Sequence, residues 1–232
     1  MPGGGLGRRH QLGGDWVLSQ IFPEWTNRLT LLGALGGAVV SLLAVGAVWY
    51  FGSPEYTDVG YQPRQPIPYS HRLHAGELSM DCRYCHASVE VSAVATIPPS
   101  KVCMNCHTVI LKESDKLEPL RESLRTGEPI HWLRVHKLPD YAYFNHGVHV
   151  RAGVGCASCH GRIDEMEVVR QVKPLSMSWC LDCHREPARH LRPLDQVTNM
   201  RWNPLPDQDE FALAAMVDRQ LKPPVDCSGC HR

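Results

Sequence analysis

The sequence predicts a mostly α-helical and irregular protein, with a single N-terminal transmembrane helix ahead of one extramembrane domain. Three observations predict it. A run of 23 uncharged residues, Leu29 to Phe51, is rich in Leu, Val, Ala and Gly. The rest of the chain carries five copies of the phrase Cys-x-x-Cys-His. The chain also has 18 Pro and 19 Gly against 4 Phe, which favours a loop-rich fold, and no region has the composition of a sheet.

Residues 1–28 form a short segment ahead of the apolar run. Arg8, Arg9 and Arg28 outnumber the acidic Asp15 and Glu24, so the positive-inside rule predicts that this end stays in the cytoplasm. The stretch from Asp15 to Trp25 mixes aromatic and polar residues. It is consistent with an interfacial segment beside the bilayer, or with a disordered tail.

Residues 29–51 are long enough to cross a bilayer core of about 30 Å at about 1.5 Å per residue. Trp49, Tyr50 and Phe51 lie where an interfacial aromatic belt is expected. These bulky residues argue against a cleaved signal peptide, which ends in a small-residue cleavage site. We therefore expect a single-pass anchor in a bacterial cytoplasmic membrane, with the remainder of the chain in the periplasm.

Residues 52–68 contain four prolines and predict an extended linker off the membrane. Residues 69–232 then form the extramembrane domain, which contains all the Cys-x-x-Cys-His motifs. Two helices are expected in it outside those motifs. One runs over Leu111 to Thr126 and is closed by Gly127, and the other runs over Gln208 to Leu221 behind an Asp207–Glu210 capping box.

The five motifs have the pattern that attaches c-type haem. Two thiols two residues apart add to the two vinyl groups of one haem, and the adjacent His becomes the proximal iron ligand. The motifs use every cysteine of the chain: Cys82, Cys85, Cys103, Cys106, Cys156, Cys159, Cys180, Cys183, Cys227 and Cys230. The proximal ligands are then His86, His107, His160, His184 and His231. The sequence predicts five covalently bound haem c groups, and the haems themselves form most of the core.

Zinc and disulfides explain the pattern less well. A zinc site joins two ligand pairs, so five pairs leave one without a partner, and zinc does not require His after every second Cys. A disulfide framework suits the even number of cysteines but leaves the histidines unexplained. Haem c accounts for both the thiols and the histidines.

An internal repeat supplies candidates for the distal iron ligands. Tyr69 to His74 and Phe144 to His149 both read as an aromatic residue, a small polar residue and then His-x-x-His, and each precedes a haem motif. A second motif follows the first in each case, so residues 69–107 and 144–184 predict two dihaem units. The fifth motif, 227–231, stands alone. Two histidines one helical turn apart can serve two neighbouring haems, so His71, His74, His146 and His149 are the expected distal ligands.

The fifth distal ligand is less clear from the sequence. His136, in the stretch before the second unit, is preferred over His131 and His190. Met166 and Met177 are rivals, and a Met/His pair would raise the potential of that haem above a bis-His haem.

The His-x-x-His segment ahead of each haem motif resembles the small multihaem cytochromes of the c3 and c7 type. In that family the first His ligates the haem of the following motif and the second ligates another haem. The resemblance thus implies that His71 and His146 serve the haems at Cys82 and Cys156, while His74 and His149 serve others.

The wider arrangement is similar to the membrane-anchored pentahaem subunit of alternative complex III. It includes the anchor, the two dihaem units, the Trp132–Pro139 stretch and the terminal fifth motif. The resemblance implies an electron conduit in a complex that oxidises menaquinol. Its implied partners are integral membrane subunits, an iron–sulfur subunit, a monohaem cytochrome and a periplasmic cytochrome or copper-protein acceptor.

The charge balance and the number of candidate axial ligands argue against other classes of function. Lys plus Arg equals Asp plus Glu, 24 each, so nothing indicates a nucleic-acid partner. A full set of axial ligands leaves no open iron, so we do not expect the chain to be an enzyme on its own or a multihaem reductase. The alternative is a self-sufficient membrane quinol dehydrogenase that feeds a soluble periplasmic reductase.

Overall fold

A computed structural model describes residues 22–231 of the chain. Helix α1, Trp25–Phe51, is the one described helix long and apolar enough to cross a membrane, with a mean hydropathy of 2.3. It begins four residues earlier than expected, after Pro23, and ends ahead of Gly52 and Pro54, which do not favour continuation of a helix. The residues up to Trp49 form one unit and those from Tyr50 form another. Most of the N-terminal segment, including residues 15–21 of the Asp15–Trp25 stretch, lies outside the described residues.

The segment expected to be a free linker is part of the second unit. It contains a short helix, α2, Pro54–Thr57, and then runs beside two distant stretches of the domain. The Gly60 amide donates to the Gln171 carbonyl at 2.8 Å, and the Gln171 amide donates to the Tyr61 carbonyl at 3.0 Å. The Gln65 side chain bonds both the amide and the carbonyl of Leu133. Residues 60–65 are therefore held against the domain and do not act as a spacer.

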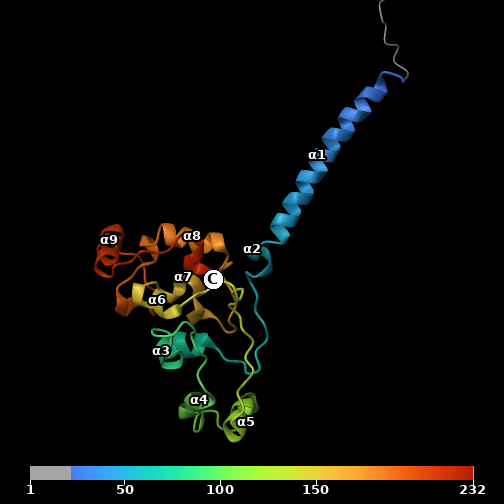
Figure 1. Cartoon of the computed structure of the whole chain (residues 1–232). Helices are drawn as coiled ribbons and strands as arrows, with labels where there is room; N and C mark the ends of the chain where they lie inside the picture. The colour runs from blue at the N-terminus through green and yellow to red at the C-terminus, as the bar shows by residue number, and fades with distance from the viewer. Residues whose placement is uncertain (1–21, 232) are drawn as a thin grey trace, which may run out of the picture. The chain divides into compact units, whose positions relative to one another are not determined.

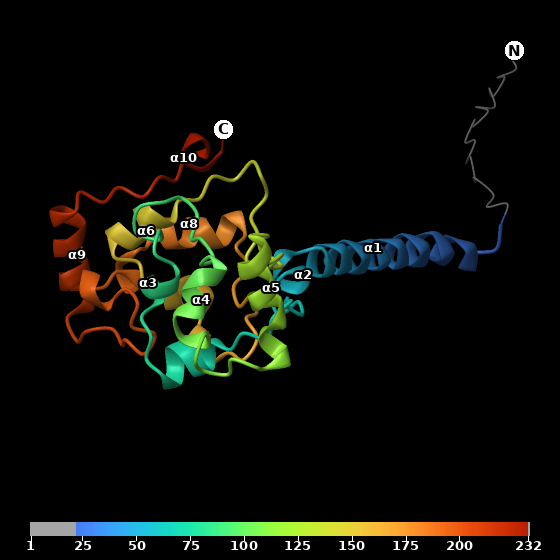
Figure 2. The same cartoon turned by 90° about the horizontal axis from the view of Figure 1, so that it is seen from below.

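The domain is made of short helices joined by long irregular stretches (Figure 1, Figure 2). In chain order they are a π-helical turn, η1, Arg72–Glu77; α3, Cys82–Cys85; α4, Ser100–His107; η2, Asp115–Leu117; α5, Glu118–Thr126; α6, His146–Ala152; α7, Cys156–His160; η3, Ile163–Glu165; α8, Met177–Arg185; η4, Ala188–His190; η5, Leu194–Gln196; α9, Gln208–Asp218; and α10, Cys227–Cys230. Among residues 22–231, extended pairing is limited to two isolated bridges. The predicted fold class, mostly helical and irregular, is confirmed.

The two helices expected outside the motifs are present but shorter. Residues 111–114 form a turn, and the helix proper is α5, which Gly127 ends in a left-handed conformation at φ 79°. Helix α9 begins at Gln208 as expected and ends at Asp218, three residues early. The expected capping box does not form, because the Asp207 side chain makes no capping hydrogen bond.

The two predicted dihaem units, residues 69–107 and 144–184, interlock through reciprocal contacts. The η1 segment of the first unit packs on η3 of the second, where the Arg72 amide donates to the Met166 carbonyl at 3.0 Å. Helix α6 of the second unit packs on residues 90–93 of the first, where the Gly147 amide donates to the Ser92 carbonyl at 2.9 Å. Each His-x-x-His segment thus lies on the loop that follows the first haem motif of the other unit.

Few apolar side chains are buried between these elements. Those under a tenth exposed within the described part of the chain are Ile67, Leu120, Met166, Leu191, Val197, Ala212 and Ala215. Around the first two haem motifs, Tyr84, Val91 and Ile110 are about half exposed or more. Such a small set of buried side chains is thin for a domain of this size.

Candidate haem sites

Each Cys-x-x-Cys pair lies in a single helical turn. Residues three apart in an α-helix share a face, so both thiols of a motif point the same way, with the His directly after them. Side chains cap three of these turns: Asp81 accepts from the Arg83 amide, Ser176 from that of Trp179, and Asp226 from that of Gly229. All ten cysteines are free thiols, as thioether attachment requires.

Four of the five proximal imidazoles are oriented by backbone carbonyls. Their Nδ1 atoms donate to Thr96 from His86 at 2.8 Å, to Ile110 from His107 at 3.0 Å, to Pro224 from His184 at 2.7 Å and to Tyr141 from His231 at 3.1 Å. A hydrogen on Nδ1 leaves the lone pair on Nε2, which is the arrangement that a metal-binding imidazole needs. Sequence reasoning missed these acceptors because any residue supplies a backbone carbonyl.

The imidazoles of the His-x-x-His segments are oriented in the same way, by hydrogen bonds from Nδ1 to backbone carbonyls. Nδ1 of His74 donates to the Ser70 carbonyl at 2.9 Å, and Nδ1 of His149 donates to the Asn145 carbonyl at 2.8 Å. His146 donates to the Ala93 carbonyl, across the contact between the two units. His71 differs, because its buried Nδ1 has no hydrogen-bond partner.

Three pairs of histidine rings face each other at a common spacing. The ring centres lie 6.3 Å apart for His74 and His107, 6.0 Å for His149 and His184, and 6.4 Å for His146 and His160. With metal–nitrogen bonds of roughly 2 Å on each side, two imidazoles on one metal have centres about 6 Å apart. His71 lies near His86: burial, followed by the charge of His86, lowers the pKa of His71 to about 4.

Aromatic residues contact the predicted distal imidazoles in the same way in the two predicted units. Tyr69 stacks on His74 at 4.5 Å between ring centres and meets His71 edge-on at 4.8 Å. Phe144 stacks on His149 at 4.4 Å and meets His146 edge-on at 4.7 Å. The sequence repeat is therefore also a repeat of side-chain geometry.

Neighbouring thiols place the five motifs in one order. Cys82 and Cys156 are neighbours whose interaction lowers the pKa of the Cys82 thiol and raises that of the Cys156 thiol, which joins the first motif to the third. The charge of Cys103 contributes to the raised pKa of Cys85, after burial, and so joins the second motif to the first. Burial, then the charges of Cys183 and Cys180, raise the pKa of Cys159 to about 12, and burial, then Cys230, raise that of Cys180. The order is second, first, third, fourth, fifth, and Figure 1 shows α4, α3, α7 and α8 following one another accordingly.

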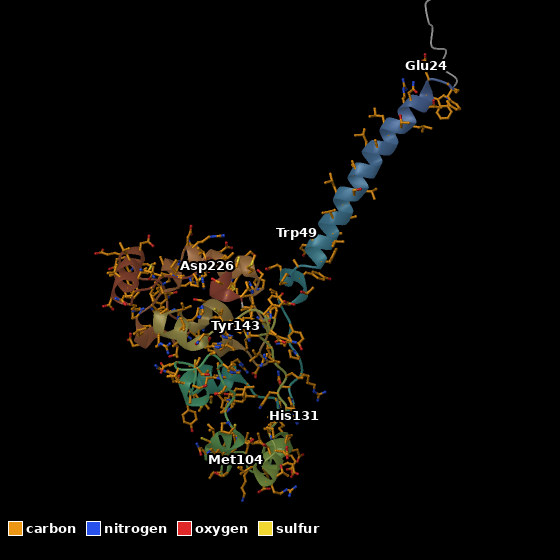
Figure 3. The ribbon with its side chains drawn as sticks, viewed as in Figure 1. Glu24, Trp49, Met104, His131, Tyr143 and Asp226 are labelled. Carbon is orange, nitrogen blue, oxygen red and sulfur yellow. The ribbon has the colours of Figure 1, made fainter. Side chains whose placement is uncertain are left out.

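The candidates for the fifth distal ligand are scattered. Nε2 of His136 lies 3.3 Å from Nδ1 of His160 and so contacts the third motif. His131 is exposed beside α5, well apart from Asp226 at the fifth motif (Figure 3). Met166 is buried between η1 and η3, and Met177 is 66% exposed. The assignment of His136 as the fifth distal ligand is therefore not supported by its contact, since the nitrogen that would bind iron faces another imidazole.

Taken together, the residues fit haem c. The thiols share a face in each motif, the paired imidazoles have the spacing of two ligands on one metal, and their Nε2 atoms are free. The thin side-chain core and the exposed apolar residues around the motifs suit a domain in which porphyrin faces supply much of the apolar contact.

Comparisons with known proteins agree with this chemistry. Residues 142–232 match the family model described as cytochrome c7 and related cytochrome c. The chain is also similar to the multihaem cytochrome c subunit of menaquinone reductase from Nitratidesulfovibrio vulgaris (strain Hildenborough), with 30% identity over 129 residues. The match covers 55% of this chain and 60% of the relative. The chain therefore spans somewhat under two thirds of the relative's length.

Proposed function

We propose that the chain is a multihaem c-type cytochrome, that it carries five haem c groups and that it conducts electrons between a membrane quinone and a periplasmic partner; its similarity to cytochrome c7 and to a menaquinone reductase subunit supports this. The observation that carries the proposal is the order in which the attachment motifs neighbour one another, from the second through the first, third and fourth to the fifth. Haem c supplies one-electron redox chemistry. Successive neighbouring haems are what a conduit requires.

The protein's own residues hold and orient the cofactors. The ten cysteines attach them, and His86, His107, His160, His184 and His231 are the proposed proximal ligands. His71, His74, His146 and His149 are the proposed distal ligands for the first, second, third and fourth motifs. With both axial positions filled by protein, these four irons bind no substrate, so we propose an electron-transfer subunit that is not an enzyme by itself.

The proposed setting is a quinone-linked membrane complex of the alternative complex III type. Helix α1 anchors the chain in a bacterial cytoplasmic membrane, with its N-terminus in the cytoplasm and the haem domain in the periplasm. Electrons pass from menaquinol oxidation to a periplasmic cytochrome or copper protein. The proposed partners are integral membrane subunits, an iron–sulfur subunit and a monohaem cytochrome. The relative's printed name describes a menaquinone reductase, which is the opposite direction, so both directions need a test.

The deciding experiment is purification of the tagged chain from native membranes in mild detergent, with mass identification of the subunits that come with it. We expect large integral membrane subunits and an iron–sulfur subunit. The complex is then assayed for cytochrome reduction by a menaquinol analogue and, separately, for reduction of the quinone by prereduced complex. Faster turnover in the first assay supports quinol oxidation, and faster turnover in the second reverses the proposed direction.

The structure keeps one alternative in play. A long free linker would argue against a self-sufficient quinol dehydrogenase, which needs a haem close to the membrane. Residues 60–65 are bonded to Gln171 and Leu133 and belong to the domain, so the length of residues 52–68 is no argument against this alternative. If the chain purifies alone and oxidises quinol, this alternative replaces the conduit in a larger complex.

A further inference from the structure

The proximal histidine of the third motif is held differently from the other four. His86, His107, His184 and His231 each present Nδ1 to a backbone carbonyl. Nδ1 of His160 instead faces Nε2 of His136 at 3.3 Å. In the proposed order of the motifs, the third lies in the middle, between the first and the fourth.

Nδ1 of His160 lies at hydrogen-bonding distance from Nε2 of His136. The two ring centres are 4.3 Å apart and the ring planes meet at 79°. The His160 ring also faces His146 at 6.4 Å between centres, with planes at 12°. His160 therefore has one neighbour at the spacing of a second metal ligand and one at hydrogen-bonding distance. His136 is the latter.

The protonation pattern follows from the role of His160. If Nε2 of His160 binds iron, the hydrogen of the neutral ring is on Nδ1, and Nδ1 donates. Nε2 of His136 must then accept, so its lone pair is used and cannot bind a metal. The stretch that carries His136 is fixed nearby, because the Gln65 side chain bonds the Leu133 amide at 2.9 Å and its carbonyl at 2.8 Å.

We propose that His136 is a positioning residue for the proximal ligand His160 and is not an iron ligand. An imidazole nitrogen is a more basic acceptor than a peptide carbonyl, so it draws the Nδ1 hydrogen further and makes His160 a stronger electron donor to its metal. The third haem then has a lower reduction potential than it would have with a carbonyl acceptor. This inference rests on the haem-binding part of the proposed function and does not need the quinone partner.

The test uses the purified full-length haem-loaded protein and the substitutions His136→Leu and His136→Gln. His136→Leu removes the acceptor, and His136→Gln keeps an oxygen that can accept. His131→Leu is the matched control, since it makes the same change at an exposed histidine of the same stretch. Each variant is titrated electrochemically while absorbance and electron paramagnetic resonance spectra are recorded.

We expect His136→Leu to move one redox transition to higher potential, leave the others in place and create no high-spin haem that the wild type lacks. His136→Gln should move the same transition less, and His131→Leu should move none. His146→Met identifies the transition, because exchanging the distal His for Met raises the potential of the third haem specifically. The transition that His146→Met raises must be the one that His136→Leu raises.

Three outcomes overturn the proposal. New high-spin haem in His136→Leu would make His136 a ligand. An unchanged electrochemical titration of His136→Leu would show that the contact between His136 and His160 has no effect on the haem. Equal movement of all transitions, or of the same transition in His131→Leu, would indicate a general structural change. Loss of quinone activity with these results otherwise intact would count against the proposed function alone.

Discussion

Single side chains in this domain fix the orientation or the protonation of a neighbouring side chain. Carbonyls on Nδ1 fix which imidazole nitrogen stays free, and the aromatic residue ahead of each His-x-x-His fixes the direction of two imidazoles at once. Asp81 likewise holds the helical turn of the first motif in place. It caps α3, bonds Arg83, and accepts from the Thr198 hydroxyl at 2.9 Å.

Phe144→Ala should destabilise the haem-loaded protein by about 1–3 kcal/mol, because it removes two aromatic contacts worth roughly 0.5–1.5 kcal/mol each. The lost contacts are the stack on His149 and the edge contact with His146. Thermal or denaturant unfolding followed at the haem absorbance measures the change. Phe144→Tyr is the control, since the first unit carries Tyr69 at the same place, and it should be close to neutral. Equal losses in the two variants would show that the stacking is not the cause.

Asp81→Asn should remove a stability contribution that depends on pH. The hydrogen bond from Arg83 lowers the pKa of Asp81 from 3.8 to about 2. Because the folded-state pKa is the lower one, the contribution is fully present above the ordinary value and is lost as the pH falls towards 2. Asp81 is partly exposed, so screening limits the contribution to about 1 kcal/mol.

The measurement compares wild type with Asp81→Asn by denaturant unfolding at about pH 5 and about pH 2.5. Asn is as good a helix cap as Asp, so the loss at the higher pH should come from the charge. The difference between the proteins should shrink at the lower pH. A difference of the same size at both values would assign the effect to packing.

At the scale of the elements, the two repeated segments, residues 69–107 and 144–184, pack against each other. The η1 segment and α6 each lie on the loop after the other unit's first haem motif. Each predicted dihaem unit is therefore packed against the other. Glycine makes both contacts possible. A Cβ on Gly147 would lie 2.9 Å from the Glu90 carbonyl oxygen, and one on Gly76 would overlap that of Asp164.

Gly76→Ala should cost about 1–3 kcal/mol of unfolding free energy, because a methyl group there forces the two backbones apart. The denaturant midpoint of the haem-loaded protein measures it, and the spectra report whether the haems stay low-spin. Gly36→Ala is the control, because nothing lies within 4 Å of a Cβ at that position of α1. If Gly76→Ala were as stable as Gly36→Ala, the close approach of η1 and η3 would not matter for stability.

At the scale of the whole molecule, the balance between side-chain core and ligand sites is unusual. Seven apolar side chains of the described residues are buried, while Leu73, Val94 and Ile110 near the haem motifs are exposed by 42%, 58% and 58%. Burial of apolar surface is the main term that offsets the conformational entropy of folding. A domain with so little of it depends on what its motifs bind.

We therefore predict that the chain is unfolded when haem attachment is prevented. Expression without the haem-attachment machinery, or with each Cys-x-x-Cys changed to Ser-x-x-Ser, should give a domain without cooperative melting and with rapid proteolysis between residues 69 and 232. Circular dichroism should then show little helix beyond α1. A sharp thermal transition in the haem-free domain would contradict this and would show that the side-chain core suffices.

The sequence by itself determined the class of the fold and predicts the chemistry of the sites. Cys-x-x-Cys-His requires only one helical turn, and His-x-x-His requires another, so local spacing is enough to name the thiols, the proximal histidines and four distal candidates. The uncharged run from Leu29 to Phe51 is likewise a local signal, and α1 confirms an apolar helix there. Helix ends were less certain, because the expected capping box at Asp207 and the turn at residues 111–114 depend on neighbours.

Only the tertiary structure decided how the motifs follow one another and what orients each imidazole. The contact of Cys82 with Cys156 and that of His136 with His160 join residues far apart in the chain, and no spacing in the sequence encodes them. The carbonyl groups that accept from the imidazoles cannot be identified from the sequence either, since every residue has a backbone carbonyl. Contacts within one helical turn follow from the spacing of residues in the sequence, whereas contacts between turns depend on how the whole chain packs.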